Sequence, residues 1–179
     1  MNTISLSPEQ TRVLDAFREG QNVFMTGPGG TGKSELIKHL VKDSDKCVQV
    51  CALTGCATVL LETPGSKTLH SWSGIGLAQD PNDVIVKRIM RNKRTKASWN
   101  KTDILIVDEV SMMSKKVFEL LDIIGKHIRK SMAPFGGLQL VFSGDFFQLP
   151  PVGNKGDPSS SKFCFTSRVR SVRSHGRMA

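Results

Sequence analysis

Apolar positions along the chain form short solid runs that alternate with stretches of helical spacing. The solid runs are bounded by polar or turn residues. We expect buried strands at residues 23–25, 48–53, 104–107 and 138–142. Helical spacing of the apolar residues occurs over residues 34–42 and 117–128. Strands that alternate with helices predict an α/β fold, in which a parallel sheet carries helices on both faces.

The first helix has a start signal in the sequence. Ser7 is the expected N-cap, Pro8 suits the first helical position, and Gln10 completes a capping box three residues after the cap. A short helix is expected over residues 57–61, and residues 68–76 are expected to form a mixed loop.

The length of 179 residues suffices for one domain with its own core, which we place at residues 1–165. Composition changes after Pro150 and Pro151, where Gly, Ser and Pro become frequent. Residues 166–179 hold many Arg and lack core periodicity. So little apolar surface cannot offset the entropy lost on ordering. We therefore expect residues 166–179 to be a basic, disordered tail.

The net charge of +9 favours a polyanionic partner, although phosphate-binding enzymes and solubility alone also give such values. Seven Lys and Arg lie within residues 87–101 with no acidic residue between them. This basic run either attracts nucleic-acid phosphates or forms a solvated helix face.

Neither the cysteines nor the N-terminus marks the chain for export. The four cysteines form no C-x-x-C pair and have no histidine at zinc-ligand spacing, so we expect reduced thiols. No apolar stretch approaches the roughly 20 residues that span a bilayer, and the N-terminus lacks the pattern of a signal peptide or presequence. We expect an intracellular protein with no membrane partner.

Residues 27–34 fit the phosphate-binding pattern G-x-x-x-x-G-K-[ST] between an expected strand and an expected helix. Glycines let the main chain wrap closely around a phosphate chain with its N–H groups turned inward. Lys33 would reach the outer phosphates, and the Ser34 hydroxyl would ligate Mg²⁺. An ordinary Gly-rich turn is the alternative. The residues of the loop are Gly27, Pro28, Gly29, Gly30, Thr31, Gly32, Lys33 and Ser34.

Two further strand ends carry polar groups suited to phosphate chemistry. Asp108 and Glu109 follow the expected strand at residues 104–107, where Asp108 would hold Mg²⁺, directly or through water, and Glu109 would polarise the attacking water. An acidic pair that caps a helix is the alternative. Gln148 follows the next strand and could hydrogen-bond a γ-phosphate or the attacking water, or be an ordinary loop amide.

Four segments in order resemble the RecD-like branch of superfamily 1 helicases: residues 6–10, 27–34, 108–112 and 144–152. Within that branch, Thr-Leu-His-Ser-Trp-Ser-Gly-Ile-Gly at residues 68–76 and Gly-Asp-Phe-Phe-Gln-Leu-Pro-Pro at residues 144–151 resemble the petite-integration-frequency (PIF) family of 5′-to-3′ DNA helicases. The resemblance covers roughly residues 1–165. It implies a RecA-like P-loop NTPase fold that uses ATP and Mg²⁺, and roles in DNA repair, recombination and telomere maintenance in the nucleus or mitochondrion.

The resemblance also implies roles for individual residues of the nucleotide site. Gln10 matches a glutamine that recognises adenine, although completing the capping box with Ser7 would explain it equally. The other matches agree with the chemistry inferred above. They are Gly32, Lys33 and Ser34 for phosphates and Mg²⁺, Asp108 and Glu109 for metal and water, and Gln148 as γ-phosphate sensor.

For nucleic acid, Thr54 and Gly55 match a family segment that contacts the backbone of single-stranded DNA. Thr68, His70 and Trp72 fall in another segment that lines the strand. Hydroxyls and backbone amides suit phosphate contacts, whereas His70 and Trp72 are explained as readily by packing. The resemblance thus implies single-stranded DNA as partner, and we expect a monomer.

The chain departs from the family pattern after Pro151. The family's second RecA-like domain, which closes on ATP and supplies arginines to the transition state, has no counterpart there. Residues 162–167 still resemble the family, whereas residues 168–179 do not and are typical of a vector-encoded or out-of-frame ending. We therefore expect a truncated product.

We expect an ATP-dependent DNA helicase motor domain whose hydrolysis and unwinding are weak or absent alone, because an arginine finger contributes roughly 10³ to 10⁵ in turnover. A non-catalytic regulatory fragment that binds nucleotide and DNA is the alternative. A kinase built on the same loop is disfavoured, because Gln148 and the segment at residues 68–76 have no obvious place in it.

Overall fold

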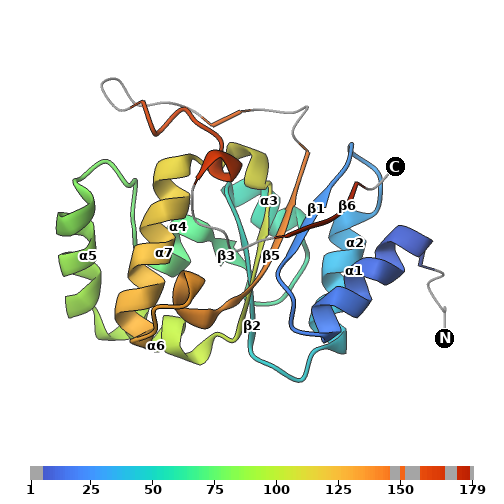
Figure 1. Ribbon diagram of the computed structural model, residues 1–179, viewed down its shortest axis with the longest axis horizontal. Coiled ribbons are helices and arrows are strands. Elements are labelled where there is room, and N and C mark those ends of the chain that lie inside the picture. The colour runs from blue at the N-terminus through green and yellow to red at the C-terminus, as the bar shows by residue number, and fades with distance from the viewer. Residues whose placement is uncertain (1–5, 146–149, 152–157, 168–172, 178–179) are drawn as a thin grey trace.

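A computed structural model describes residues 6–145, 150–151, 158–167 and 173–177. Its centre is a sheet of six parallel strands in the order β3-β2-β4-β5-β1-β6 (Figure 1). The strands are β1 Val23–Thr26, β2 Val48–Ala52, β3 Lys67–Thr68, β4 Ile104–Asp108, β5 Gln139–Gly144 and β6 Arg173–Arg177. The order is not sequential, because parallel neighbours are joined by crossovers.

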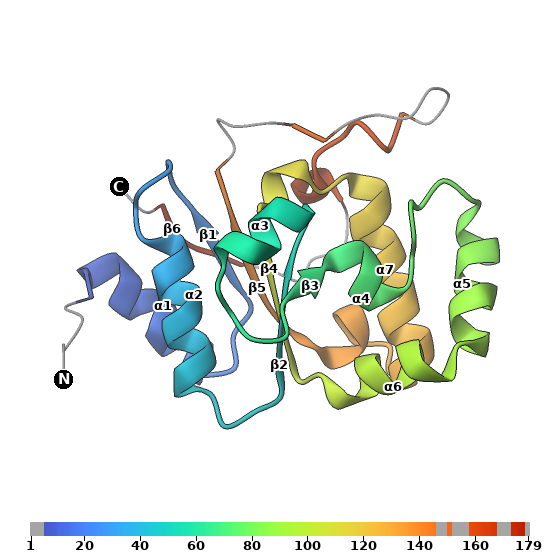
Figure 2. The same ribbon diagram turned by 180° about the vertical axis from the view of Figure 1, so that it is seen from behind.

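Helices cover both faces of this sheet, which confirms the predicted fold class (Figures 1 and 2). Successive residues of β4 point to opposite faces, so Ile104 and Ile106 belong to one buried core and Leu105 and Val107 to the other. The first core is closed by α1 Pro8–Arg18 and α2 Lys33–Asp43. The second is closed by α4 Leu69–Ser73, α5 Asn82–Arg91, α6 Lys93–Lys101 and α7 Lys115–Arg129.

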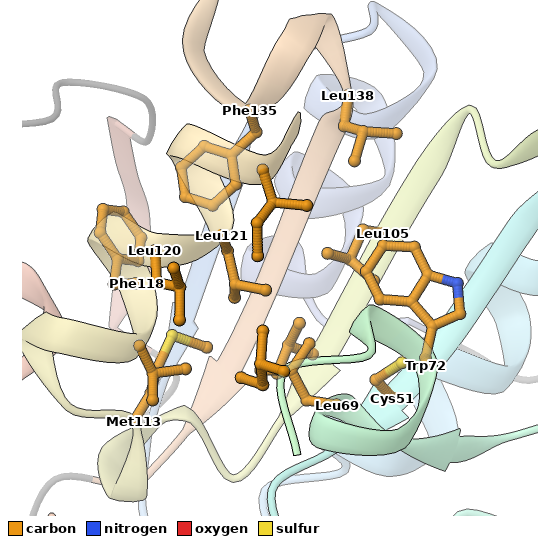
Figure 3. Close-up of a cluster of buried hydrophobic side chains, with 14 of the residues drawn as sticks. Cys51, Leu69, Trp72, Leu105, Met113, Phe118, Leu120, Leu121, Phe135 and Leu138 are labelled. Carbon is orange, nitrogen blue, oxygen red and sulfur yellow. The ribbon is translucent and has the colours of Figure 1, made fainter. Parts of the chain in front are cut away.

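The second core is rich in aromatic rings and fixes β5 against α7 (Figure 3). The ring centroids of Phe118 and Phe142 are 5.9 Å apart and those of Phe118 and Phe135 are 4.9 Å apart, both edge to face. Such pairs contribute about 0.5–1.5 kcal/mol beyond the area they bury. Phe142 lies on β5 two residues before its end, so this packing holds that strand end in place.

Short elements connect the strand ends to the helices. The α3 helix Gly55–Leu60 follows β2, and the 3₁₀ turn η1 Val110–Met112 joins β4 to α7. A second 3₁₀ turn, η2 Pro134–Gly137, precedes β5. The third, η3 Cys164–Thr166, is tied to the start of α7 because the Cys164 amide donates to the Met113 carbonyl at 3.1 Å.

One expectation from the sequence is wrong. Residues 68–76 are not simply a loop, because they contain α4, which begins where the Thr68 hydroxyl accepts from the Ser71 amide at 3.2 Å. Within the expected tail, residues 173–177 form β6, paired in parallel with β1; the expected division at residue 165 stays a prediction. Strand pairing satisfies main-chain groups along the free edge of β1 and needs no apolar periodicity.

Within the described ranges, no helix is both long enough and apolar enough to cross a bilayer.

Candidate functional site

The carboxyl ends of β4, β5 and β1 lie side by side, and each carries polar residues. Val107 of β4 is level with Phe142 of β5, and Thr26 of β1 is level with Gly144 of β5. The loop after β1 and the acidic residues that end β4 therefore open at one edge of the sheet. In open parallel sheets this edge is where ligands bind.

The phosphate-binding loop, residues 27–34, links β1 to α2 in the way the sequence predicts. Gly30 and Gly32 have φ of +82° and +78°, a region that side chains disfavour. Gly32 also begins α2 with no side-chain cap on the helix. The first N–H groups of this 11-residue helix thus remain available to an anion, aided by the helix dipole.

The ammonium group of Lys33 is folded back onto the loop. Its Nζ donates to the Gly27 carbonyl at 2.7 Å and the Pro28 carbonyl at 2.8 Å, and the Thr31 hydroxyl lies 3.5 Å away. These neutral acceptors hold the charge at the mouth of the loop. Ser34, the residue expected to ligate Mg²⁺, is exposed one position further along α2.

Gln10 connects the capping box of α1 to the phosphate-binding loop. The box is confirmed, since Ser7 N donates to Gln10 Oε1 at 2.9 Å and Gln10 N donates to Ser7 Oγ at 3.2 Å. The other amide atom, Gln10 Nε2, lies 3.5 Å from the Thr31 carbonyl. A Cβ on Gly32 would lie 3.0 Å from the same nitrogen. Gln10 thus adopts the capping position at the rim of the loop, and adenine recognition stays a prediction.

The acidic turn after β4 faces this loop. Asp108 is 7% exposed, and within the described residues no hydrogen bond or ion pair reaches its carboxylate. Glu109 has a positive φ of +57°. Burial raises the pKa of Glu109, as do the nearby carboxylates of Asp108 and Asp145, while Lys33 lowers it. Three carboxylates and one ammonium group therefore interact at this edge of the sheet.

Gly144 brings the end of β5 into contact with the acidic turn. A Cβ at this position would lie 3.0 Å from Val110 Cγ1 and 3.1 Å from the amide nitrogens of both Val110 and Ser111. A side chain at this position would therefore push Val110 or Ser111 away by a few tenths of an ångström. The next residue, Asp145, is 7% exposed. The sequence patterns assign Asp145 no individual role, although its place directly after a strand-ending glycine is a signal that points to it.

Gln148, the expected γ-phosphate sensor, lies outside the described residues.

The donor set at this edge fits Mg²⁺ bound together with a nucleotide. Mg²⁺ prefers oxygen ligands and is usually held by one or two protein groups, substrate phosphates and water. The Ser34 hydroxyl and the buried Asp108 carboxylate supply such oxygens. A buried carboxylate without a hydrogen bond is costly unless a cation pairs with it. No dense group of three or more His, Cys, Asp or Glu suited to a metal occurs in the described part, and a nucleotide-bound ion does not require one.

The segments expected to contact DNA lie at the same edge of the sheet, after β2 and β3. Thr54 and Thr68 are helix N-caps, because their hydroxyls accept from the amides of Ala57 and Ser71, both at 3.2 Å. Gly55 is exposed at the start of α3. Both threonine hydroxyls therefore have a structural role already, and their contact with DNA stays a prediction.

His70 and Trp72 differ in their exposure. His70 is half-buried on α4, and burial lowers its pKa. Trp72 is 3% exposed and lies in the second core (Figure 3). It packs against Trp99 with ring centroids 4.6 Å apart. The indole of Trp72 is therefore enclosed by packing in this structure, and its contact with DNA stays a prediction.

The basic run at residues 87–101 lies on α5 and α6, which supports the solvated-face reading for part of it. Lys87 pairs with Asp83 at 3.3 Å and Arg88 with Asp80 at 2.9 Å, all four side chains being exposed. Exposed pairs of this kind contribute little to stability. Arg91, Lys93 and Arg94 are also exposed.

A parallel sheet whose first strand leads into a phosphate-binding loop, with an acidic strand end beside it, defines a P-loop NTPase domain of the RecA-like type. The sequence matches the PIF1-like helicase family over residues 5–172, and the chain belongs to that family.

Individual relatives agree with this membership. The chain is 41% identical over 172 residues to the ATP-dependent DNA helicase RRM3 of Saccharomyces cerevisiae, which covers 93% of this chain and 23% of that protein. It is 43% identical over 164 residues to the ATP-dependent DNA helicase PIF1 of Danio rerio, which covers 91% of this chain and 25% of that protein. The chain thus spans about a quarter of these relatives.

Solved structures show the same fold. The crystal structure of Pif1 helicase from Candida albicans superposes with a TM-score of 0.84 and 39% identity, over 96% of this chain and 39% of that one. Pif1 helicase from Bacteroides in complex with ADP-AlF3 and ssDNA gives a TM-score of 0.78 and 29% identity, over 94% and 40% of the two chains.

Proposed function

We propose that this chain is the ATP-binding motor domain of a 5′-to-3′ DNA helicase. It binds Mg·ATP where β1, β4 and β5 end, and single-stranded DNA along the segments that begin at Thr54 and Thr68. One observation carries this conclusion: the charges of Lys33, Asp108 and Asp145 all act on the Glu109 carboxylate. They come from the phosphate-binding loop side of α2 and from the ends of the neighbouring strands β4 and β5. Relatives named ATP-dependent DNA helicases, and a relative crystallised with ADP-AlF3 and ssDNA, support the same substrates.

The loop would exchange its internal contacts for contacts with the nucleotide. Lys33 would release the carbonyls of Gly27 and Pro28 and pair with the outer phosphates. The carbonyl oxygens are neutral acceptors whereas phosphate oxygens carry negative charge, so the exchange replaces ion–dipole contacts of Lys33 with an ion pair and favours binding. The free N–H groups at the start of α2 would donate hydrogen bonds to the remaining phosphate oxygens.

Hydrolysis would depend on the acidic turn. Glu109 is proposed to accept a hydrogen bond from the attacking water and polarise it, and its raised pKa makes it a stronger base than an ordinary carboxylate. Ser34 and Asp108 are proposed to hold Mg²⁺, which when bound would neutralise phosphate charge. Gln148 is proposed to contact the γ-phosphate.

Gln10 is proposed to contact the adenine. A glutamine amide carries one donor and one acceptor, which match N7 and N6 of that base. To do so it must leave the Ser7 amide.

Turnover by the chain alone is proposed to be slow. Arginines that stabilise the transition state come from a second RecA-like domain in this family, and none is placed beside Glu109 in the described structure. ATPases of ordinary efficiency turn over about 1–10³ times per second. Loss of an arginine finger would lower that by roughly 10³ or more.

A coupled ATPase assay with and without single-stranded DNA tests the catalytic half of the proposal. We expect turnover below about 0.1 per second, lost altogether in Glu109→Gln while nucleotide binding persists. Turnover above about 1 per second that Lys33→Ala abolishes would contradict the need for a second domain.

Anisotropy of a labelled 15-nucleotide oligo-dT tests the DNA half. Gly55→Asp places a carboxylate in the proposed DNA segment, where a Cβ meets no atom within 4 Å, so we expect weaker binding without loss of folding. Ala97→Asp is the matched control, since Ala97 is exposed within the basic run on α6. If only Ala97→Asp weakened DNA binding, the DNA would lie on the basic run, which would contradict the proposed path.

A further inference from the structure

An apolar groove separates α5 from α7 on the outer side of the molecule, away from the strand ends. Its volume is about 640 Å³. The two helices lie next to each other in both views, with α5 outermost (Figures 1 and 2). We call this feature the α5–α7 groove.

The floor of the groove is aliphatic. Val86 and Met90 come from α5 and Ile123 comes from α7, and all three are only partly buried. Val86 and Met90 are one helical turn apart, on the side of α5 next to the one that Ile85 and Ile89 bury in the core. The apolar face of α5 is therefore wider than the part of it that the second core buries.

The rim of the groove is mostly basic. Lys87 and Arg91 line it from α5, and His127 lines it from α7. The one carboxylate among the lining residues, Asp83, already pairs with Lys87 at 3.3 Å. Among the described residues no carboxylate pairs with Arg91. Beyond Arg91, the exposed residues Lys93 and Arg94 extend the positive charge at this end of the groove.

We propose that the α5–α7 groove docks an acidic, amphipathic segment of a partner protein. Apolar side chains of that segment would cover Val86, Met90 and Ile123, and its carboxylates would pair with Arg91 and compete with Asp83 for Lys87. The floor spans one to two helical turns, so an occupant of about 8–12 residues fits it. This surface does not take part in the nucleotide or DNA sites, so the inference goes beyond the proposed function.

Other occupants fit the groove less well. Single-stranded nucleic acid binds through aromatic platforms as well as cations, and among the described residues no Phe, Tyr or Trp lines this groove. A second copy of the chain carries a net charge of +9, which opposes contact with a basic rim. An acidic, amphipathic partner would make apolar contacts with the floor and ion pairs with the rim.

Selection from a phage-displayed library of random 12-residue peptides, panned on the purified chain, tests the proposal without assuming a ligand. We expect a consensus of two or three apolar residues at helical spacing flanked by Asp or Glu. The consensus peptide, made with a fluorophore, should bind with a Kd on the order of 1–100 µM. A consensus without acidic residues would overturn the proposal.

Two variants place the peptide in the groove. Met90→Lys puts a charge on the floor and should weaken binding about tenfold or more. Met132→Lys is the matched control, because Met132 is 87% exposed and does not line the groove. Arg91 is exposed, so Arg91→Glu should leave folding intact. This variant should bind the acidic peptide more weakly and bind a peptide with Lys in place of Asp and Glu more tightly.

Equal peptide binding by all three variants would overturn the proposal. It would also be overturned if oligo-dT displaced the peptide from the wild-type chain but not from Arg91→Glu, because the groove would then bind nucleic acid. Concentration-dependent dimers that Met90→Lys abolishes would assign the groove to a second copy instead.

Discussion

Replacing Gly144 by alanine should destabilise the protein and weaken nucleotide binding together. The added Cβ would lie 3.0 Å from Val110 Cγ1 and 3.1 Å from the amide nitrogens of Val110 and Ser111. Ordinary contact distances are 3.4–4 Å, so the shortfall is 0.3–0.4 Å or more. Two of the three atoms belong to the main chain and cannot rotate away. Overpacking of this kind costs about 1–3 kcal/mol.

The displaced main chain directly follows Glu109, so the acidic turn must move away from the phosphate-binding loop. Gly55→Ala is the matched control, because its Cβ meets nothing within 4 Å and its φ is not positive. Both substitutions replace glycine by alanine and so reduce the conformational entropy of the unfolded chain alike. The difference in unfolding free energy between the two variants therefore reports the steric cost at Gly144.

Thermal unfolding and calorimetric titration with Mg·ADP measure the two effects of Gly144→Ala. For a domain of this size, about 2 kcal/mol corresponds to a Tm roughly 4–8 °C below that of Gly55→Ala. Nucleotide affinity should fall in Gly144→Ala and stay unchanged in Gly55→Ala. If the two variants melt within about 1 °C of each other, β5 and the acidic turn do not approach each other as described.

Three further predictions concern the caps, the carboxylates and the thiols. Ser7→Ala removes the hydroxyl that accepts from the Gln10 amide at 3.2 Å and should cost about 1 kcal/mol in urea unfolding; an unchanged midpoint would contradict the cap. Burial and Asp108 raise the pKa of Glu109 above its ordinary value of 4.5, so ionising it opposes folding as pH rises through the raised pKa. Glu109→Gln should therefore raise the Tm at pH 8 but not at pH 4, and a stabilisation that grows towards acid pH would refute the sign. Burial raises the pKa of Cys51 to about 12, so a thiol reagent should modify exposed Cys56 in the native protein and reach Cys51 and buried Cys164 only in denaturant.

The sequence predicts those parts of the fold and site that depend on local patterns. The glycines of residues 27–34 require a particular main-chain path, and the structure has positive φ at Gly30 and Gly32. The apolar run before Asp108 predicts a buried strand, which β4 is. The capping box of Ser7 and Gln10 is equally local, because both partners lie within one helical turn.

Features that depend on contacts between distant segments could not be predicted. Trp72 is buried because Trp99, 27 positions further along, packs against it, and the sequence near Trp72 does not contain that information. Asp145 interacts with Glu109 because β4 and β5 are neighbours in the sheet. The β6 strand depends on a free edge of β1 rather than on its own composition.

Calorimetric titration with Mg·ATPγS tests most directly whether the three strand ends form one triphosphate site. The wild-type chain should bind one nucleotide, and Lys33→Ala should lose about 1.5–3 kcal/mol of charge-assisted hydrogen bonding, which is roughly 10- to 150-fold in Kd. Lys42→Ala, an exposed lysine on the same helix, should bind like the wild type. Equal affinity in the wild type and Lys33→Ala, or no binding to a folded wild-type chain, would contradict the account.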